Sequence, residues 1–130
     1  MLDTLDARAL AEFYRELLGW SYREGHEAPA PGEPDVDGSD WLILHNPDGG
    51  IGLAFQQVER MPVSTWPDAD IPQQLHLDLT VADTDELAAE RDRVLALGGT
   101  ILDDTRADAE EEPIYVFADP QGHPFCIFVV

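Results

Sequence analysis

The sequence contains one cysteine, few basic residues and no long apolar run, and each scarcity excludes a class of protein. Cys126 is the only cysteine of the 130 residues, so no disulfide can form within the chain and no zinc-ribbon pattern is present. No apolar stretch approaches the ~18 residues that a membrane span needs, and the N-terminus lacks the features of an export signal. We therefore expect a cytoplasmic protein without a membrane partner.

Basic side chains are also scarce. Seven lysine and arginine residues stand against 27 aspartate and glutamate residues, which gives a formal net charge of -20. Such a charge repels phosphate backbones, so nucleic acid is not expected as a partner. The carboxylates form either a solvated acidic surface or a groove that attracts a cationic ligand. The chain has no GxSxG, phosphate-loop or HExxH motif to support hydrolase chemistry.

Two segments have the apolar spacing of amphipathic helices. In residues 6–20 the apolar positions are Leu10, Phe13, Tyr14 and Leu17, between Asp6 as an N-cap and Gly19 as a stop. Residues 83–99 repeat this plan, with Asp83 as the cap and Glu86 completing a capping box. The apolar stripe of the second helix is predicted to comprise Leu87, Val94 and Leu95, and the helix to end at Gly98 and Gly99.

Strand-like runs follow each helix in the same order. They lie at residues 20–25, 40–46 and 51–58 in the first half and 99–104, 114–119 and 123–130 in the second. A short strand opens each half, at residues 2–6 and 74–81. The chain is therefore predicted to be one α+β domain of two βαβββ modules, residues 1–58 and 74–130, joined by a connector at residues 59–73. Curved mixed sheets of the two modules would face each other across a cleft.

The strand that opens the second half carries the clearest chemical signal. Alternation places Leu75, Leu77, Leu79 and Val81 on one face and Gln74, His76, Asp78 and Thr80 on the other. The leucine face is expected to meet the helix, which turns the polar face toward the cleft. His76 is then a candidate metal ligand or acid–base group, with Asp78 to orient it. The alternative is a histidine partly buried in the strand and hydrogen-bonded to Asp78 or Gln74.

Further candidates come from other strands. Cys126 can serve as a soft ligand, a nucleophile or a small buried hydrophobe, and its apolar neighbours favour the last. Most aromatic residues are expected in the core, while one or two at the rim of the cleft can stack on a planar ligand. The remaining histidines, His26, His45 and His123, have no chelating spacing. The predicted pocket comprises Gln74, His76, Asp78, Trp41, Phe55 and Cys126.

The whole chain resembles a known superfamily. The duplicated pattern, with "DARALAEFYRELLGW" after a short strand and "ADPQGHPFCIF" at the end, is similar to the vicinal oxygen chelate superfamily. This superfamily includes glyoxalase I, ring-cleaving dioxygenases and bleomycin-resistance proteins. The segment "STWPDADIPQQLHLDLTV", with "GHPFC", is more particularly similar to a glyoxalase-like subgroup. The resemblance implies a glyoxalase-like fold, whereas fold alone does not fix the chemistry.

In metal-binding members of the superfamily the ligands come from the first and last strands of each half. By this resemblance His76 matches the histidine that opens the second half, and Cys126 stands where relatives have a ligand glutamate. The matching position in the last strand of the first half is Ala54 or Gln56, and the one in its first strand would precede Met1. His76 is then the only plausible metal ligand. The resemblance therefore implies a small-molecule cleft without a tightly bound metal, with a divalent metal as the alternative.

Three functions stay open on these grounds. The first is a homodimeric, glyoxalase-like protein that binds a small molecule. The second is a metal-dependent lyase, isomerase or dioxygenase, in which His76 ligates the metal or acts as a general base oriented by Asp78. The third is a protein that sequesters a bleomycin-type cationic antibiotic, which the charge of -20 and the tryptophans favour.

Overall fold

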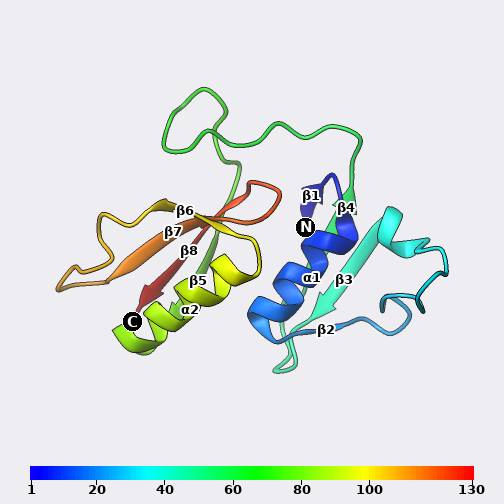
Figure 1. Cartoon of the computed structure of the whole chain (residues 1–130), viewed down its shortest axis with the longest axis horizontal. Helices are drawn as coiled ribbons and strands as arrows, with labels where there is room; N and C mark the ends of the chain where they lie inside the picture. The colour runs from blue at the N-terminus through cyan, green and yellow to red at the C-terminus, as the bar shows by residue number, and fades with distance from the viewer. The chain divides into compact units, whose positions relative to one another are not determined.

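The computed structural model describes residues 1–130 and divides them into two compact units, Met1–Met61 and Pro62–Val130 (Figure 1). The first unit contains β1 (Leu2–Thr4), α1 (Ala7–Leu18), β2 (Ser21–Tyr22), the short 3₁₀ helix η1 (Asp37–Ser39), β3 (Trp41–His45) and β4 (Leu53–Gln57). The second contains β5 (Leu77–Val81), α2 (Thr84–Ala96), β6 (Thr100–Asp103), β7 (Ile114–Ala118) and β8 (Pro124–Val129). The predicted α+β class and the repeated βαβββ order are confirmed.

The two sheets have the same topology. Their strand orders are β1-β4-β3-β2 and β5-β8-β7-β6, and in each the opening strand pairs in parallel with the last strand. Corresponding positions can therefore be matched by register. Leu2 and Leu79 lie equally far before the aspartate that caps the next helix, and their partners are Phe55 and Ile127. One residue earlier on the last strands, Ala54 of the first unit corresponds to Cys126 of the second.

Helix α1 follows the prediction closely. The carboxylate of Asp6 accepts a hydrogen bond from the Ala9 N–H at 2.9 Å, and the helix stops at Gly19, whose φ of 66° lies in the left-handed region. The predicted apolar stripe is buried at Leu10, Phe13, Tyr14 and Leu17. Burying each such side chain contributes roughly 1.5–3 kcal/mol, so this stripe fixes α1 on one face of the first sheet.

Helix α2 differs from the prediction at its apolar stripe. Asp83 caps the helix through the Glu86 N–H at 2.9 Å, as the capping pattern predicts. Leu87 and Val94 are buried, but Leu95 is 44% exposed, so its assignment to the stripe is wrong. At about 100° per residue, Val94 falls almost in line with Leu87, whereas Leu95 is rotated well to the side of that line. Neither helix has the length and apolar character needed to cross a membrane.

Strand β5 begins later than predicted. It starts at Leu77 rather than Gln74, and Leu75 is 53% exposed instead of packing toward the helix. The reason lies across the sheet, because the partner strand β8 begins only at Pro124 and its first contact with β5 pairs Phe125 with Leu77. By this register His76 falls beside Pro124, which has no backbone N–H, and the residues before His76 lie beyond the start of β8.

Candidate functional site

The second sheet has one apolar face and one polar face. On β5, Leu77 and Leu79 are half-buried, whereas Asp78 and Thr80 are exposed, as the alternation predicts. Cys126 on β8 pairs with Asp78 in parallel register and therefore shares its face. We call the side formed by Asp78, Thr80 and Cys126 the polar face. It is the side of the sheet opposite α2.

Three side chains converge at one end of the polar face. His76, which lies just before β5, places its Nε2 3.4 Å from Oδ1 of Asp78. The ligand atoms of His76, Asp78 and Cys126 all lie within 4.8 Å of one another. The side chains of His76 and Asp78 are 40% and 57% exposed, whereas Cys126 is buried. These residues form the His–Asp–Cys cluster.

The cluster keeps its sulfur protonated at neutral pH. Burial raises the pKa of the Cys126 thiol to about 11, and the nearby carboxylate of Asp78 acts in the same direction. A thiolate is the reactive form of cysteine, and here its formation is suppressed. Cys126 therefore lacks the electropositive surroundings of a catalytic nucleophile. In the protein without ligand, its side chain lines the cluster as a neutral thiol.

The donor set also fits a divalent metal of the kind the resemblance implies. Imidazole nitrogen, carboxylate oxygen and cysteine sulfur are the three donor types that zinc takes in proteins. A tetrahedral ion with bonds of about 2.0–2.3 Å holds its ligand atoms roughly 3.3–3.8 Å apart. The 3.4 Å separation of His76 and Asp78 already has this spacing. The sequence left His76 as the only plausible ligand, and the structure brings two further donors to its side.

The other predicted pocket residues differ in burial and in the unit to which they belong. Gln74 is exposed in the segment before β5. Trp41 is on β3 of the first unit, 36% exposed, with the ring of His26 edge-on at 5.6 Å. Phe55 is fully buried and stacks on Tyr14 at 5.7 Å, so it is a core residue. Of the predicted set, His76, Asp78 and Cys126 form the cluster.

Two of the remaining histidines, His26 and His123, have local partners. Nδ1 of His26 accepts a hydrogen bond from the Ile43 N–H at 3.1 Å, which ties the loop after β2 to β3. Nδ1 of His123 lies 2.8 Å from the buried carboxylate of Asp119. The same carboxylate accepts a hydrogen bond from the His123 N–H at 3.0 Å, within the turn that leads into β8. Both histidines therefore support loops.

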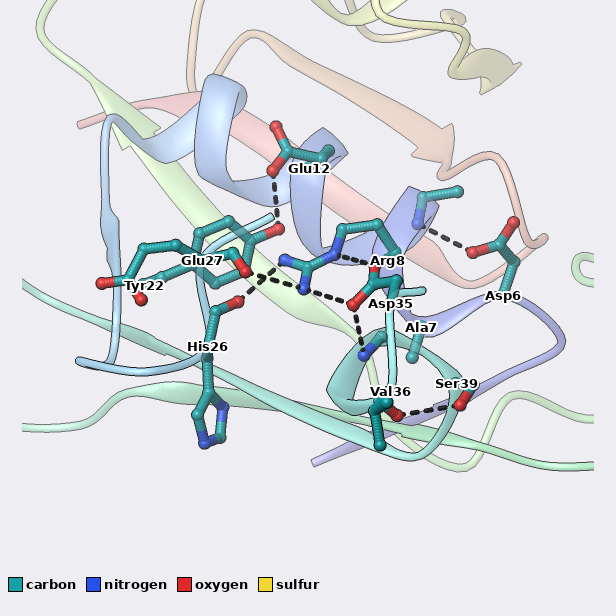
Figure 2. A network of polar contacts seen from close by, with 12 residues as sticks. Asp6, Ala7, Arg8, Glu12, Tyr22, His26, Glu27, Asp35, Val36 and Ser39 are labelled. Carbon is teal, nitrogen blue, oxygen red and sulfur yellow. Dashed lines mark hydrogen bonds and ion pairs between the residues drawn. The ribbon is translucent and has the colours of Figure 1, made fainter. Parts of the chain in front are cut away.

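A second polar network, which the sequence did not reveal, lies in the first unit (Figure 2). The guanidinium of Arg8 on α1 donates to both carboxylate oxygens of Asp35, at 2.7 and 3.0 Å. It also donates to the backbone carbonyls of His26 at 2.8 Å and Glu27 at 3.3 Å. One side chain thus binds two stretches of the loop between β2 and η1. Bidentate arginine–carboxylate pairs are among the stronger polar contacts in proteins.

Neighbouring groups complete this Arg8 network. The guanidinium lies 4.8 Å from the centre of the Tyr22 ring, and the Tyr22 hydroxyl donates to Glu12 at 2.7 Å. Burial and the bond to Glu12 raise the pKa of Tyr22 to about 12. The Arg8 guanidinium holds the pKa of Asp35 below its usual range, helped by the N–H of Gly38. The donors and acceptors here are occupied by one another, so the network holds the loop in place.

A cavity of about 340 Å³ opens on the other side of the second sheet. It lies between α2 and the β6–β7 loop, and its lining comprises Thr84, Leu87, Ala88, Arg91, Ala107, Asp108, Ala109, Pro113 and Tyr115. Tyr115 pairs with Ile127, the neighbour of Cys126, and therefore points away from the polar face. The cavity and the His–Asp–Cys cluster are separate places in the second unit.

Comparisons with known proteins agree with this fold. A family model described as a glyoxalase-like domain matches residues 1–128. No curated protein matches the sequence. A glyoxalase/bleomycin resistance protein/dioxygenase family enzyme from Burkholderia phytofirmans PsJN is 16% identical, with a TM-score of 0.69 over 100% of this chain and 95% of that one.

Two further solved structures have the same architecture. The fosfomycin resistance protein FosX from Mesorhizobium loti is 16% identical, with a TM-score of 0.67 over 99% of this chain and 86% of that one. A glyoxalase-related enzyme from Fulvimarina pelagi is 24% identical, with a TM-score of 0.63 over 100% and 85%. At these identities the likeness establishes the fold, while the chemistry depends on the site.

Proposed function

Because the chain belongs to the glyoxalase-like domain family, we propose that it binds a small organic molecule at the polar face of its second unit, with no metal held permanently. The observation that carries this proposal is the convergence of His76, Asp78 and Cys126 within 4.8 Å. An imidazole and a carboxylate that are both solvent-accessible can recognise hydroxyl and carbonyl groups of a ligand. The protonated thiol beside them adds a weak donor.

The test is to map ligand contacts on the isotope-labelled protein by two-dimensional NMR, with a chelator present. The panel comprises the adduct of methylglyoxal with a thiol, a catechol, fosfomycin and bleomycin. We expect at least one compound to shift the backbone amides of Asp78, Thr80 and Cys126. His76→Ala should abolish the shifts, and His45→Ala, which alters an exposed histidine of the first unit, should leave them unchanged.

Three results would contradict this proposal. Shifts confined to the cavity beside α2 would move the binding site to the opposite side of the sheet. No response to any compound of the panel, at concentrations up to the millimolar range, would retire small-molecule binding at the polar face. A response that His45→Ala abolishes as completely as His76→Ala would show that the histidine of the cluster has no special part.

A second candidate function is a metal-dependent lyase, isomerase or dioxygenase, and the three-donor cluster is the observation that favours it. In this function the ion is held at His76, Asp78 and Cys126, or Asp78 orients His76 as a general base. Turnover is measured with methylglyoxal plus a thiol and with catechols, after addition of nickel, zinc or manganese. Activity that His76→Ala removes would support it, and no turnover with any of these metals would retire it.

The acidic composition favours a cationic ligand as a further possibility for the same face. The proposed partner is a bleomycin-type antibiotic, attracted by the net charge of -20. Calorimetry should then show binding that weakens as ionic strength rises. An absence of heat at low ionic strength would remove this ligand. We also propose a cytoplasmic homodimer, which light scattering of the purified protein and cell fractionation would test.

A further inference from the structure

We propose that the cavity between α2 and the β6–β7 loop binds a small zwitterion with an apolar body, of which an amino acid such as leucine or phenylalanine is the simplest example. The cavity lies on the side of the second sheet opposite the His–Asp–Cys cluster, so this site is independent of the proposed function. Its volume of about 340 Å³ is near the lower end of the roughly 300–1,000 Å³ typical of ligand pockets. The volume therefore favours a ligand smaller than a typical drug.

Two opposite charges line the cavity from different walls. Arg91 belongs to α2 and Asp108 to the β6–β7 loop, and no ion pair joins them. Nε and Nη2 of Arg91 lie 2.9 and 2.8 Å from one oxygen of Asp92, which leaves further guanidinium donors for a second carboxylate. In the proposed complex the carboxylate of the ligand binds Arg91, and its ammonium group binds Asp108.

In the first unit the corresponding helix and loop are joined by a direct bond. Arg8 of α1 binds both carboxylate oxygens of Asp35, in the segment between β2 and β3, at 2.7 and 3.0 Å. The β6–β7 loop occupies the same place in the order of the second unit. Arg91 lies about two turns farther along its helix than Arg8, so the two arginines are not equivalent positions. In the second unit a ligand with both charges takes the place of the direct ion pair.

The remaining walls suit an apolar side chain. Ala88 of α2 and Ala107 and Ala109 of the loop are small, so the space between helix and loop stays open. The half-buried ring of Tyr115 stacks on that of Phe117, with 5.6 Å between the ring centres, and this contact fixes its orientation. The ring therefore offers a flat apolar surface to the body of the ligand.

Hydrogen bonds hold the wall that carries Asp108. The carbonyl of Arg106 accepts hydrogen bonds from the N–H groups of Ala109 and Ile114, both at 3.2 Å. The guanidinium of Arg106 donates to the carbonyl of Glu111 at 3.4 Å. The loop is thus closed on itself around Asp108, which gives this carboxylate a defined place in the cavity.

The surrounding charges favour a zwitterion over a simple ion. The net charge of -20 repels an anion at long range, and Asp108 repels it at the cavity itself. A simple cation is opposed by Arg91, which stays charged at physiological pH. A zwitterion has no net charge to be repelled, and it offers a partner to each of the two residues.

The test compares ligands of one shape and different charge by two-dimensional NMR titration of the isotope-labelled full chain at pH 7. Phenylalanine carries both charges, 2-phenylethylamine lacks the carboxylate, and 3-phenylpropionate lacks the ammonium group. Leucine, 3-methylbutylamine and 4-methylpentanoate form a second series. Each amino acid should bind about 10-fold more tightly than its two analogues, since each analogue leaves one charged residue without a partner. The shifted amides should include Ala88, Arg91, Ala109 and Tyr115.

Two variants assign each charge of the ligand to one residue. Arg91→Gln should weaken phenylalanine binding about 10-fold and should not weaken the binding of 2-phenylethylamine, which has no carboxylate. Asp108→Asn should weaken phenylalanine to a similar degree and should not weaken 3-phenylpropionate. Arg93→Gln on the same helix and Asp104→Asn in the same loop alter residues outside the lining. These two controls should leave phenylalanine binding unchanged.

Three results would overturn the zwitterion site. They are no amide shift with either amino acid up to the millimolar range, an analogue that binds as tightly as its amino acid, and shifts confined to Asp78, Thr80 and Cys126. If a variant fails to fold, the order of the three ligands on the unaltered protein decides alone. Failure of this site leaves the proposed function intact, because that function is measured with other compounds at the polar face.

Discussion

The two units have one scaffold and use it differently. In the first, polar side chains bind one another: Arg8 holds Asp35 and two backbone carbonyls, and the loop after β2 is fixed to α1. In the second, His76 and Asp78 stay exposed and stand beside a thiol. The matched positions Ala54 and Cys126 show the same divergence. Two copies of one fold thus differ in whether their polar side chains are engaged with one another or exposed to solvent.

The largest expected effect tests whether the scaffolds are equivalent in stability. Phe55 and Phe117 are fully buried in the first and second units. Truncation of either, Phe55→Ala or Phe117→Ala, should lower the free energy of unfolding by about 3–5 kcal/mol, because a cavity replaces a ring. Urea denaturation measures the change. Ile51→Ala, which alters an exposed side chain, is the control. If only one of the two phenylalanine variants lost less than about 1 kcal/mol, the two units would not be equivalent in stability.

The second prediction compares how much the Arg8 network and the His–Asp–Cys cluster contribute to stability. Arg8→Met keeps much of the side chain's volume but leaves Asp35 without its bidentate partner. We expect a loss of about 1.5–3 kcal/mol, typical of hydrogen bonds to charged groups. His76→Ala should change stability by no more than about 0.5 kcal/mol, since an exposed pair contributes little. Equal losses in the two variants, measured by urea denaturation, would contradict the division of roles.

A smaller effect concerns the protonation of Cys126. Its pKa is raised to about 11 by burial and by Asp78, so little thiolate forms at pH 9. Asp78→Asn removes the negative charge that opposes the thiolate, which lowers this pKa. If the pKa falls by about one unit, alkylation at pH 9 should accelerate nearly tenfold. Iodoacetamide labelling followed by mass spectrometry measures the rate. Asp103→Asn, an equal change of charge on β6, should leave the rate unaltered.

The smallest expected effect concerns α2. Leu95→Ala alters a residue that is 44% exposed, so unfolding should change by no more than about 0.5 kcal/mol. Leu87→Ala, on the buried line of the same helix, should cost about 2–5 kcal/mol. Thermal and urea denaturation of the two variants give the comparison. A large loss of unfolding free energy in Leu95→Ala would show that Leu95 belongs to the buried apolar stripe of α2 after all.

Local signals account for what the sequence predicted well. Asp6 and Asp83 are recognisable caps, and the helical spacing of α1 is unambiguous, so both helices and the repeated order could be found. Alternation also placed Asp78 on the polar face. The start of β5 could not be found, because it is set by Pro124 on another strand. The sequence contains no local periodicity that links Arg8 to Asp35 or brings Cys126 beside His76, since tertiary register creates both contacts.

The parallel pairing of β5 with β8 also sets the order in which the cluster assembles. The β7–β8 hairpin closes through a short turn. By contrast, β5 is the first strand and β8 the last strand of the second unit in sequence, so their pairing closes a loop that spans most of the unit. Local contacts form sooner than distant ones because shorter loops lose less entropy on closure. We therefore expect the thiol to be in its strand before the imidazole and the carboxylate arrive. Their meeting then marks the final step in the folding of the second unit.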